Sequence, residues 1–274
     1  MKKLSIPDGI QLAWDERGHG PLVVLANQFF GQPETFAGLL EDLERDHRVV
    51  TYDVRGIGAS TRRGPYDLAT DAADLEALIE AAGPPAVVLA FADGCNRAVR
   101  VAARRPELVT GIVSPAGNPV GRRATQGTDS LAASDSVLAA LVEMMGTDYR
   151  GALRTIFSTA NPDWDNERVR QRVSATVESV PQEAALFRMR EWIEDHAVDE
   201  GLAVGDGLWL LADGTVPWFS IEVAHRTREI LPDAHVLEVE DGPISRPDIA
   251  AGVIRRLTAG DAVGSRSETK TGRV

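Results

Sequence analysis

Apolar residues recur along this chain in two spacings: short uninterrupted runs, and longer stretches with a period near 3.6. The runs have the length of buried strands and lie at residues 11–14, 22–26, 48–53, 87–91, 109–113, 208–212 and 235–239. The periodic stretches predict helices at residues 36–43, 71–82, 94–105, 219–230 and 247–257. Strands that alternate with helices in this way predict an α/β fold with a doubly wound, mostly parallel sheet.

One part of the chain departs from this alternation. From about residue 119 to residue 204 the strand signals stop, and four helical patterns follow at residues 130–145, 149–157, 167–180 and 182–197. We therefore expect a helical lid at residues 119–204, inserted between two parts of one core, residues 1–118 and 205–257. The remaining residues, 258–274, are small and polar, which predicts a disordered tail.

Composition narrows the class of protein. A chain of 274 residues with 43% hydrophobic and 26% charged residues is ordinary for a globular protein with a large core. The formal net charge of −12 argues against binding to nucleic acid, because phosphate backbones require a basic surface. We expect no membrane span and no signal peptide, since no apolar run is long enough. The single cysteine allows no internal disulfide and favours a cytoplasmic location.

The most informative local signal is a buried strand from Val87 that runs through a tight turn into a helix near Gly94. This is the setting of a G-x-S-x-G nucleophile elbow, which needs small residues two before and two after the nucleophile. With Ala90 and Gly94 at those places, the nucleophile position falls on Ala92. The other register puts Asp93 on the turn, and the spacing of small residues favours Ala92.

Further segments carry a family resemblance. Residues 52–60, Tyr-Asp-Val-Arg-Gly-Ile-Gly-Ala-Ser, are similar to a D-x-R-G-x-G-x-S turn, and residues 25–31 occupy the position of an oxyanion loop. Residues 102–109 match the end of the helix after the elbow, and Gly64-Pro65-Tyr66 adds to the pattern. The chain thus resembles the α/β-hydrolase fold superfamily over essentially its whole length, and most of all the 3-oxoadipate enol-lactone hydrolase branch.

The resemblance also implies that the family's Ser-His-Asp triad is replaced. The serine falls on Ala92, whose methyl group cannot attack a carbonyl carbon. The histidine, which follows the last strand in the family, falls on Pro243, and the acid falls on Val216 with Asp213 displaced from that register. We therefore predict that the usual general base is missing together with the nucleophile.

Asp93 is the candidate catalytic residue that remains. A carboxylate in an apolar pocket has a raised pKa that suits a general base, whereas the alternative is a helix N-terminal carboxylate that complements the dipole. Asn27 and Gln28 are candidate hydrogen-bonding groups for a ligand oxygen, or they satisfy the loop backbone. His196 closes the last helix of the predicted lid, where it either faces the pocket or serves as a cap.

Apolar residues on the loops and lid helices predict a pocket for a flat or greasy organic molecule, although each of them also suits an ordinary core. Together with Ala92 they are our candidate substrate-binding residues: Phe29, Phe30, Phe91, Trp164, Trp192, Trp218, Pro243 and Ile244. We expect no metal and no cofactor.

These residues predict an atypical, cofactor-free enzyme that acts on a hydrophobic small molecule, as a monomer or a homodimer. The resemblance implies isomerase, cyclase, lyase or cofactor-independent oxygenase chemistry for such a member of the fold. A composition rich in Ala and Arg is typical of high-GC bacteria and suggests natural-product biosynthesis. Two alternatives stay open: a non-catalytic protein that binds a ligand or stabilises a partner, and a hydrolase with Asp93 as its nucleophile.

Overall fold

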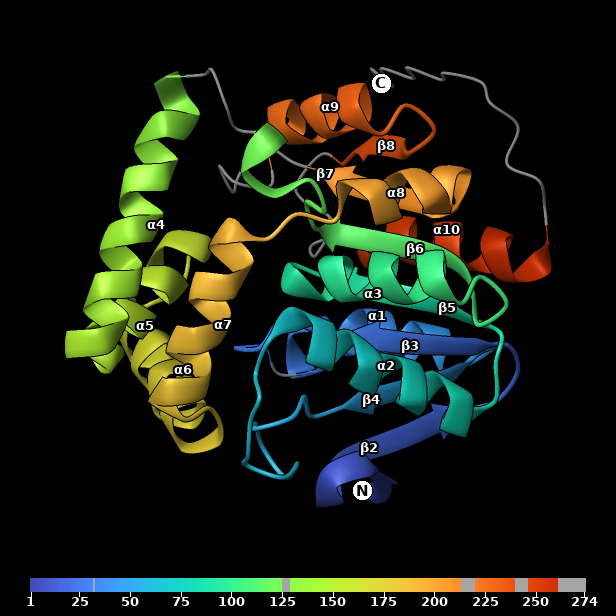
Figure 1. Ribbon diagram of the computed structural model, residues 1–274, viewed down its shortest axis with the longest axis horizontal. Coiled ribbons are helices and arrows are strands. Elements are labelled where there is room, and N and C mark those ends of the chain that lie inside the picture. Colours follow the sequence, from blue (N-terminus) through green and yellow to red (C-terminus); the bar gives the residue numbers. More distant parts are fainter. Residues whose placement is uncertain (32, 125–128, 213–219, 240–245, 261–274) are drawn as a thin grey trace.

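A single sheet organises the molecule (Figure 1). The computed structural model describes residues 1–31, 33–124, 129–212, 220–239 and 246–260. Within these residues eight strands are arranged in the order β1-β2-β4-β3-β5-β6-β7-β8, antiparallel at β1 and β2 and parallel from β4 to β8. The strands are β1 (Lys2–Ile6), β2 (Ile10–Gly18), β3 (Leu22–Ala26), β4 (Arg48–Tyr52), β5 (Ala86–Phe91), β6 (Val109–Ala116), β7 (Leu208–Ala212) and β8 (His235–Glu238). The predicted α/β class with a mostly parallel sheet is confirmed.

Helices cover both faces of the sheet. In Figure 1, α2 (Leu68–Ala82), α3 (Asp93–Arg104) and α8 (Val198–Val204) lie on one face, and α1 (Ala37–Leu43) and α10 (Pro247–Ala259) lie on the other. Alternate residues of the central strands β3 and β5 therefore belong to two apolar cores, and every residue of these two strands is apolar. Val24 and Val88 belong to the core with α2 and α3, whereas Val23 and Val87 belong to the core with α1 and α10. The remaining helix of this part is α9 (Ile221–Ile230), which packs on β7 and β8.

Four further helices form a group beside the carboxyl ends of the strands (Figure 1). This α4–α7 group consists of α4 (Asp129–Thr147), α5 (Tyr149–Ala160), α6 (Asn166–Ser179) and α7 (Gln182–Glu194). It lies within the segment for which the sequence predicts a lid, and both the lid and the domain boundaries stay predictions. The next helix, α8, packs against α3 of the core.

A few element boundaries differ from the sequence prediction. The sequence does not predict β1, which is an edge strand with mostly exposed residues. Helix α2 begins at Leu68, three residues early, because the Asp67 carboxylate accepts a hydrogen bond from the Thr70 N–H and caps it. Helix α7 ends at Glu194, and α10 continues to Ala259, two residues into the predicted tail. Residues 261–274 of that tail lie outside the described residues.

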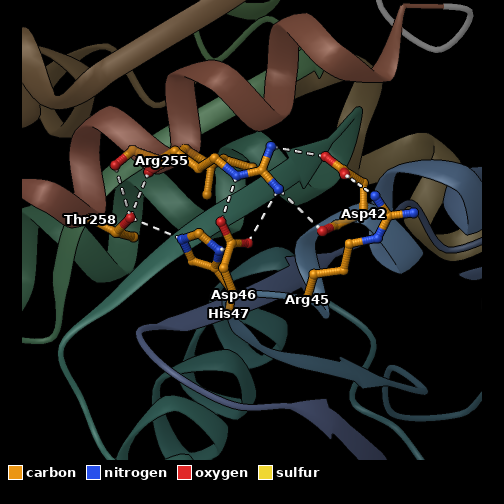
Figure 2. Close-up of polar contacts among 7 residues, drawn as sticks. Asp42, Arg45, Asp46, His47, Arg255 and Thr258 are labelled. Carbon is orange, nitrogen blue, oxygen red and sulfur yellow. Dashed lines mark hydrogen bonds and ion pairs between the residues drawn. The ribbon is translucent and has the colours of Figure 1, made fainter.

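A polar cluster joins α10 to the turn after α1 (Figure 2). The Arg255 guanidinium donates to the carboxylates of Asp46 and Asp42, at 2.7 and 2.9 Å. The His47 ring lies 2.8 Å from the Asp46 carboxylate through Nδ1 and 2.9 Å from the Thr258 hydroxyl through Nε2. We call these five residues the α1–α10 cluster. It fixes the last helix of the described chain to the far face of the sheet.

Among the helices of the described residues, none has both the length and the apolar composition that crossing a bilayer requires.

Candidate active site

The turn between β5 and α3 has the strained backbone of a nucleophile elbow. Ala92 holds φ 51° and ψ −120°, and it is one of only two non-glycine residues at positive φ among the described residues. A Cβ at Gly94 would collide with the carbonyl oxygen of Ala26, so only glycine fits there. The Ala92 N–H donates to the carbonyl oxygen of Ala116 at 2.7 Å and holds the turn against β6. The chain therefore adopts the register with Ala92 at the elbow, and Asp93 begins the helix.

A cavity lies beside this elbow. Its empty volume, which includes the part that opens to solvent, is about 450 Å³. The core contributes the loop after β3 and the elbow, and the α4–α7 group contributes the facing apolar wall. The residues that line the cavity are Gln28, Phe29, Phe30, Ala92, Asp93, Leu138, Leu141, Ile156, Met189 and Trp192.

Asp93 is the one ionisable residue among the described residues that line this cavity. The residue is 1% exposed. Its Oδ1 accepts a hydrogen bond from the Phe29 N–H at 3.3 Å, and its Oδ2 lies 3.0 Å from Nη2 of Arg97 in an ion pair. Burial raises the pKa of Asp93 to about 6, because the loss of water costs the carboxylate more than the nearby Arg97 charge returns. An acid with this pKa is ionised at neutral pH and is readily protonated.

Arg97 lies behind the cavity, one turn along α3 from Asp93, and its side chain is fully buried. Besides the ion pair, its Nη2 donates to the backbone carbonyl of Asn27, and its Nη1 lies 3.5 Å from the Tyr52 hydroxyl. It thus joins α3 to the loop after β3 and to the end of β4.

Two backbone donors of the loop after β3, the N–H groups of Gln28 and Phe29, are already engaged within the protein. The Phe29 N–H donates to Asp93, and the Gln28 N–H donates to the side-chain oxygen of Asn27 at 2.8 Å. A serine hydrolase of this fold uses an N–H from this loop to stabilise the oxyanion of its tetrahedral intermediate. Here each of these two N–H groups already donates a hydrogen bond to a side chain of the protein itself.

More buried charges lie next to Asp93 and Arg97. Arg188 of α7 forms a bidentate ion pair with Asp71 of α2, with distances of 2.7 and 2.9 Å, and both side chains are fully buried. Arg55 forms a second bidentate pair with Asp74, and its carbonyl accepts from Arg188 at 2.6 Å. We call these four residues, with Asp93 and Arg97, the buried network.

Helix α7 is attached to the core at two places, at Arg188 in its middle and at Asp195 directly after its end. Arg188 anchors it to α2, as described. At its end, the Asp195 carboxylate accepts from Asn96 at 2.7 Å and from Arg100 at 3.0 Å, and both donors belong to α3. The two residues of α7 that line the cavity, Met189 and Trp192, lie between these two attachments.

No histidine is among the described residues that line the cavity. The chain has five histidines, and the structure describes all of them. His196 is exposed and follows α7, where its backbone carbonyl accepts from Arg100. The others lie elsewhere: His19 is exposed, His47 belongs to the α1–α10 cluster, His225 pairs with Glu238, and His235 stacks on Trp209.

The structure brings six of the sequence-predicted site residues together at the cavity: Gln28, Phe29, Phe30, Ala92, Asp93 and Trp192. Four others are not among the lining residues. Asn27 is buried within its loop, Trp164 packs under the Arg168 guanidinium, and His196 is exposed. Phe91 packs edge-on against Phe36 on the far face, because neighbouring residues of a strand point to opposite sides. Trp218, Pro243 and Ile244 lie outside the described residues.

Sequence reasoning missed five residues of the site. Four are lining residues: Leu138, Leu141, Ile156 and Met189. The first two are spaced three apart on a predicted helix, so helical periodicity could have placed them on one face. The fifth is Arg97, and its signal was the spacing of four from Asp93 within one predicted helix, which brings opposite charges together.

Comparison with known proteins identifies the family. Residues 21–193, more than half of the chain, match the family model described as alpha/beta hydrolase fold. The chain therefore belongs to the α/β-hydrolase family, as the sequence motifs predicted. The resemblance to one branch of the family stays a prediction. No curated protein matches the chain.

Solved structures show the same fold. An esterase from Exiguobacterium antarcticum has a TM-score of 0.76 at 17% identity, covering 93% of this chain and 98% of the other. A bromoperoxidase from Bacillus anthracis has a TM-score of 0.76 at 16% identity, covering 93% and 97%. E-2-(acetamidomethylene)succinate hydrolase has a TM-score of 0.72 at 19% identity, covering 94% and 98%. At these identities the likeness establishes the fold and not the activity.

Proposed function

We propose that this protein is a cofactor-free enzyme that binds a hydrophobic small molecule in the cavity and uses Asp93 to move a proton. The observation that carries the proposal is a buried carboxylate, its pKa raised to about 6 by burial, in a cavity whose other lining residues are apolar except for Gln28, beside an elbow whose side chain is a methyl group. A base of this pKa is ionised at neutral pH and still returns its proton easily, which is the condition for general acid–base catalysis.

The geometry argues against acyl transfer. Ala92 offers no nucleophilic atom, no histidine is among the described lining residues, and the Gln28 and Phe29 N–H groups are engaged within the protein. Asp93 lies in the first turn of α3 rather than at the elbow, which speaks against Asp93 as a nucleophile. Isomerisation, cyclisation, elimination or cofactor-independent oxygenation fits better, because in each of them a single acid–base group can start the reaction by moving a proton.

The cavity wall supports a hydrophobic ligand. Phe29, Phe30 and Trp192 supply aromatic surfaces, and the lining leucines, isoleucine and methionine supply aliphatic ones. Contact with such a wall removes apolar ligand surface from water, and this burial stabilises the complex. A role in natural-product biosynthesis in the cytoplasm belongs to this proposal and rests on composition alone.

A second candidate function is a non-catalytic binding protein. One observation favours it: both carboxylate oxygens of Asp93 already face partners within the protein, the Phe29 N–H and Arg97. In this alternative Asp93 is a structural group that closes the former oxyanion site, and the cavity only holds its ligand.

Hydrogen–deuterium exchange of a carbon acid tests the proposal without knowledge of the natural substrate. Neutral aryl ketones such as 2-tetralone are incubated with the protein in D₂O, and label uptake is followed by mass spectrometry. We expect the wild type to catalyse uptake, and Asp93→Asn to lower the rate by about 10² or more because the base is lost. The dissociation constant, measured by calorimetry, should change much less, since the apolar wall remains.

The matched control is Asp46→Asn, which removes a carboxylate far from the cavity and should leave exchange unchanged. Binding without any exchange by the wild type would favour the binding protein. Full exchange in Asp93→Asn would remove Asp93 from the mechanism, and esterase activity sensitive to a fluorophosphonate would contradict the whole proposal.

A further inference from the structure

The feature that the proposed function leaves unexplained is the complete burial of Arg97. A guanidinium removed from water costs several kcal/mol unless charged and polar partners surround it. Arg97 faces partners on three different elements: the Asp93 carboxylate in its own helix, the Asn27 carbonyl in the loop after β3, and the Tyr52 hydroxyl at the end of β4. Of these partners, Asp93 lines the cavity, and Asn27 directly precedes the lining residue Gln28.

Nη2 of Arg97 contacts both core segments that line the cavity, through the Asp93 carboxylate in one and the Asn27 carbonyl in the other. Asp93 and Ala92 belong to the elbow, whereas Gln28, Phe29 and Phe30 belong to the loop that Asn27 begins. The loop and the elbow are also linked directly, through the hydrogen bond from the Phe29 N–H to Asp93. Among the described hydrogen bonds, this one of 3.3 Å is the only one that would still join the loop to the elbow if Arg97 were removed.

We propose that Arg97 is the positioning residue of this site: its guanidinium holds the Asp93 carboxylate against the Phe29 N–H and holds the loop after β3 against α3. This inference rests on the proposed function of Asp93. It assigns to Arg97 no contact with the ligand, since Arg97 is not among the lining residues.

Among the charges around Asp93, that of Arg97 has the largest effect on its ionisation. Asp71 of α2 and Arg188 of α7 also face Asp93, and Tyr52 of β4 is neutral because burial raises its pKa to about 12. Asp71 and Arg188 form an ion pair with each other, so their effects on Asp93 oppose one another. Arg97 is the remaining positive charge, and it lowers a pKa that burial raises. Its removal should therefore leave at least about half of the Asp93 side chains protonated at neutral pH.

The shape of the side chain also matters. A guanidinium presents five N–H donors in a fixed plane and can serve a carboxylate and a carbonyl together. Lysine at residue 97 would supply the charge through a single ammonium and could not keep all three contacts. We therefore expect Arg97→Lys to preserve the ionisation of Asp93 and to loosen the loop, whereas Arg97→Met should affect both.

Carbon-13 NMR titration of the Asp93 carboxyl, assigned by comparison with Asp93→Asn, tests this without a substrate. In Arg97→Met we expect the titration midpoint to rise by about one pH unit or more, and in Arg97→Lys to stay within about half a unit of the wild type. The control is Arg104→Met, which removes a half-exposed charge from the same helix and should move nothing. A wild-type midpoint in Arg97→Met would overturn the proposal.

The double variant Arg97→Met/Asp93→Asn covers the case in which Arg97→Met does not fold, since it leaves neither charge unpaired. Amide hydrogen exchange at Gln28 and Phe29 should be at least about tenfold faster in it than in Asp93→Asn alone. Equal exchange would overturn the positioning role. Both readouts need no turnover, so they distinguish a failure of this inference from a failure of the proposed function.

Discussion

Asp93 at the cavity and Asp46 in the α1–α10 cluster each lie beside an arginine, Arg97 in the first case and Arg255 in the second. Asp93 is 1% exposed, and its pKa is raised to about 6 because burial outweighs the attraction of Arg97. The Asp46 side chain is 47% exposed, and the hydrogen bond from Arg255 lowers its pKa to about 2. An arginine neighbour therefore does not decide the direction of a pKa shift; the amount of water left around the carboxylate does.

The same contrast holds for stability. Pairs in the buried network have lost most of their hydration, so that removing one partner leaves a buried charge without compensation. Pairs in the α1–α10 cluster keep part of their hydration and can fall back on water. We therefore expect similar substitutions in the two regions to have very different effects, and three experiments test this.

The largest effect is expected for Arg188→Met, which leaves the Asp71 carboxylate buried and unpaired. The free energy of unfolding should fall by about 3–5 kcal/mol, as measured by urea denaturation. The double variant Arg188→Met/Asp71→Leu should recover a large part of this loss, since it removes both charges. A loss below about 1 kcal/mol in the single variant would show that the pair behaves like an exposed one.

An intermediate effect is expected in the pH dependence of stability, with opposite signs for the two aspartates. The raised pKa of Asp93 means that the folded state keeps a proton which the unfolded state has lost, so stability should fall as the pH rises from about 4 to 6. The upper limit of this loss is about 3 kcal/mol, at about 1.4 kcal/mol per pH unit. The lowered pKa of Asp46 adds stability above about pH 4 that is lost as the pH falls toward 2.

Unfolding curves of Asp93→Asn and Asp46→Asn at a series of pH values check this expectation. Only the slopes are compared, because Asp93→Asn also changes the buried surroundings of Arg97 at every pH. Asp93→Asn should flatten the slope between pH 4 and 6, and Asp46→Asn the slope below pH 4, by less because Asp46 is half exposed. The same slope in Asp93→Asn as in the wild type would contradict the raised pKa.

The smallest effect is expected for Arg255→Met in the α1–α10 cluster. Its pairs with Asp42 and Asp46 are partly exposed, so the free energy of unfolding should change by less than about 1 kcal/mol. The change should shrink further in 1 M salt, whereas the effect of Arg188→Met should persist, because salt screens exposed charges far more than buried ones. Equal salt sensitivity of the two variants would remove the contrast between the regions.

The fold could be predicted from the sequence where one element carries its own signal. Residues 22–26 and 208–212 were predicted with the boundaries of β3 and β7, because both faces of these strands are buried and the apolar run is unbroken. The elbow at Ala92 followed from the small residues Ala90 and Gly94. Edge strand β1 was not predicted, because its residues are mostly exposed and it forms only by pairing with β2.

The site was harder to predict because its contacts join distant segments. Asp71 and Arg188 are 117 residues apart, and no local pattern announces that they pair. Phe91 was predicted at the site and faces the far core, because the strand continues through it and turns only at Ala92. The position of Asp93 was predicted, whereas its partners depend on how three elements pack against α3.

Helix α7 has a further consequence for the motion of the molecule. Sequence order and position place it with the α4–α7 group, but Arg188 and Asp195 attach it to the core, so we expect it to unfold locally together with the core. An opening of the cavity that keeps these attachments intact has to come from α4, α5 or the loop after β3. Met189 and Trp192 then remain as a fixed wall, and the time a ligand stays bound depends on the opposite wall.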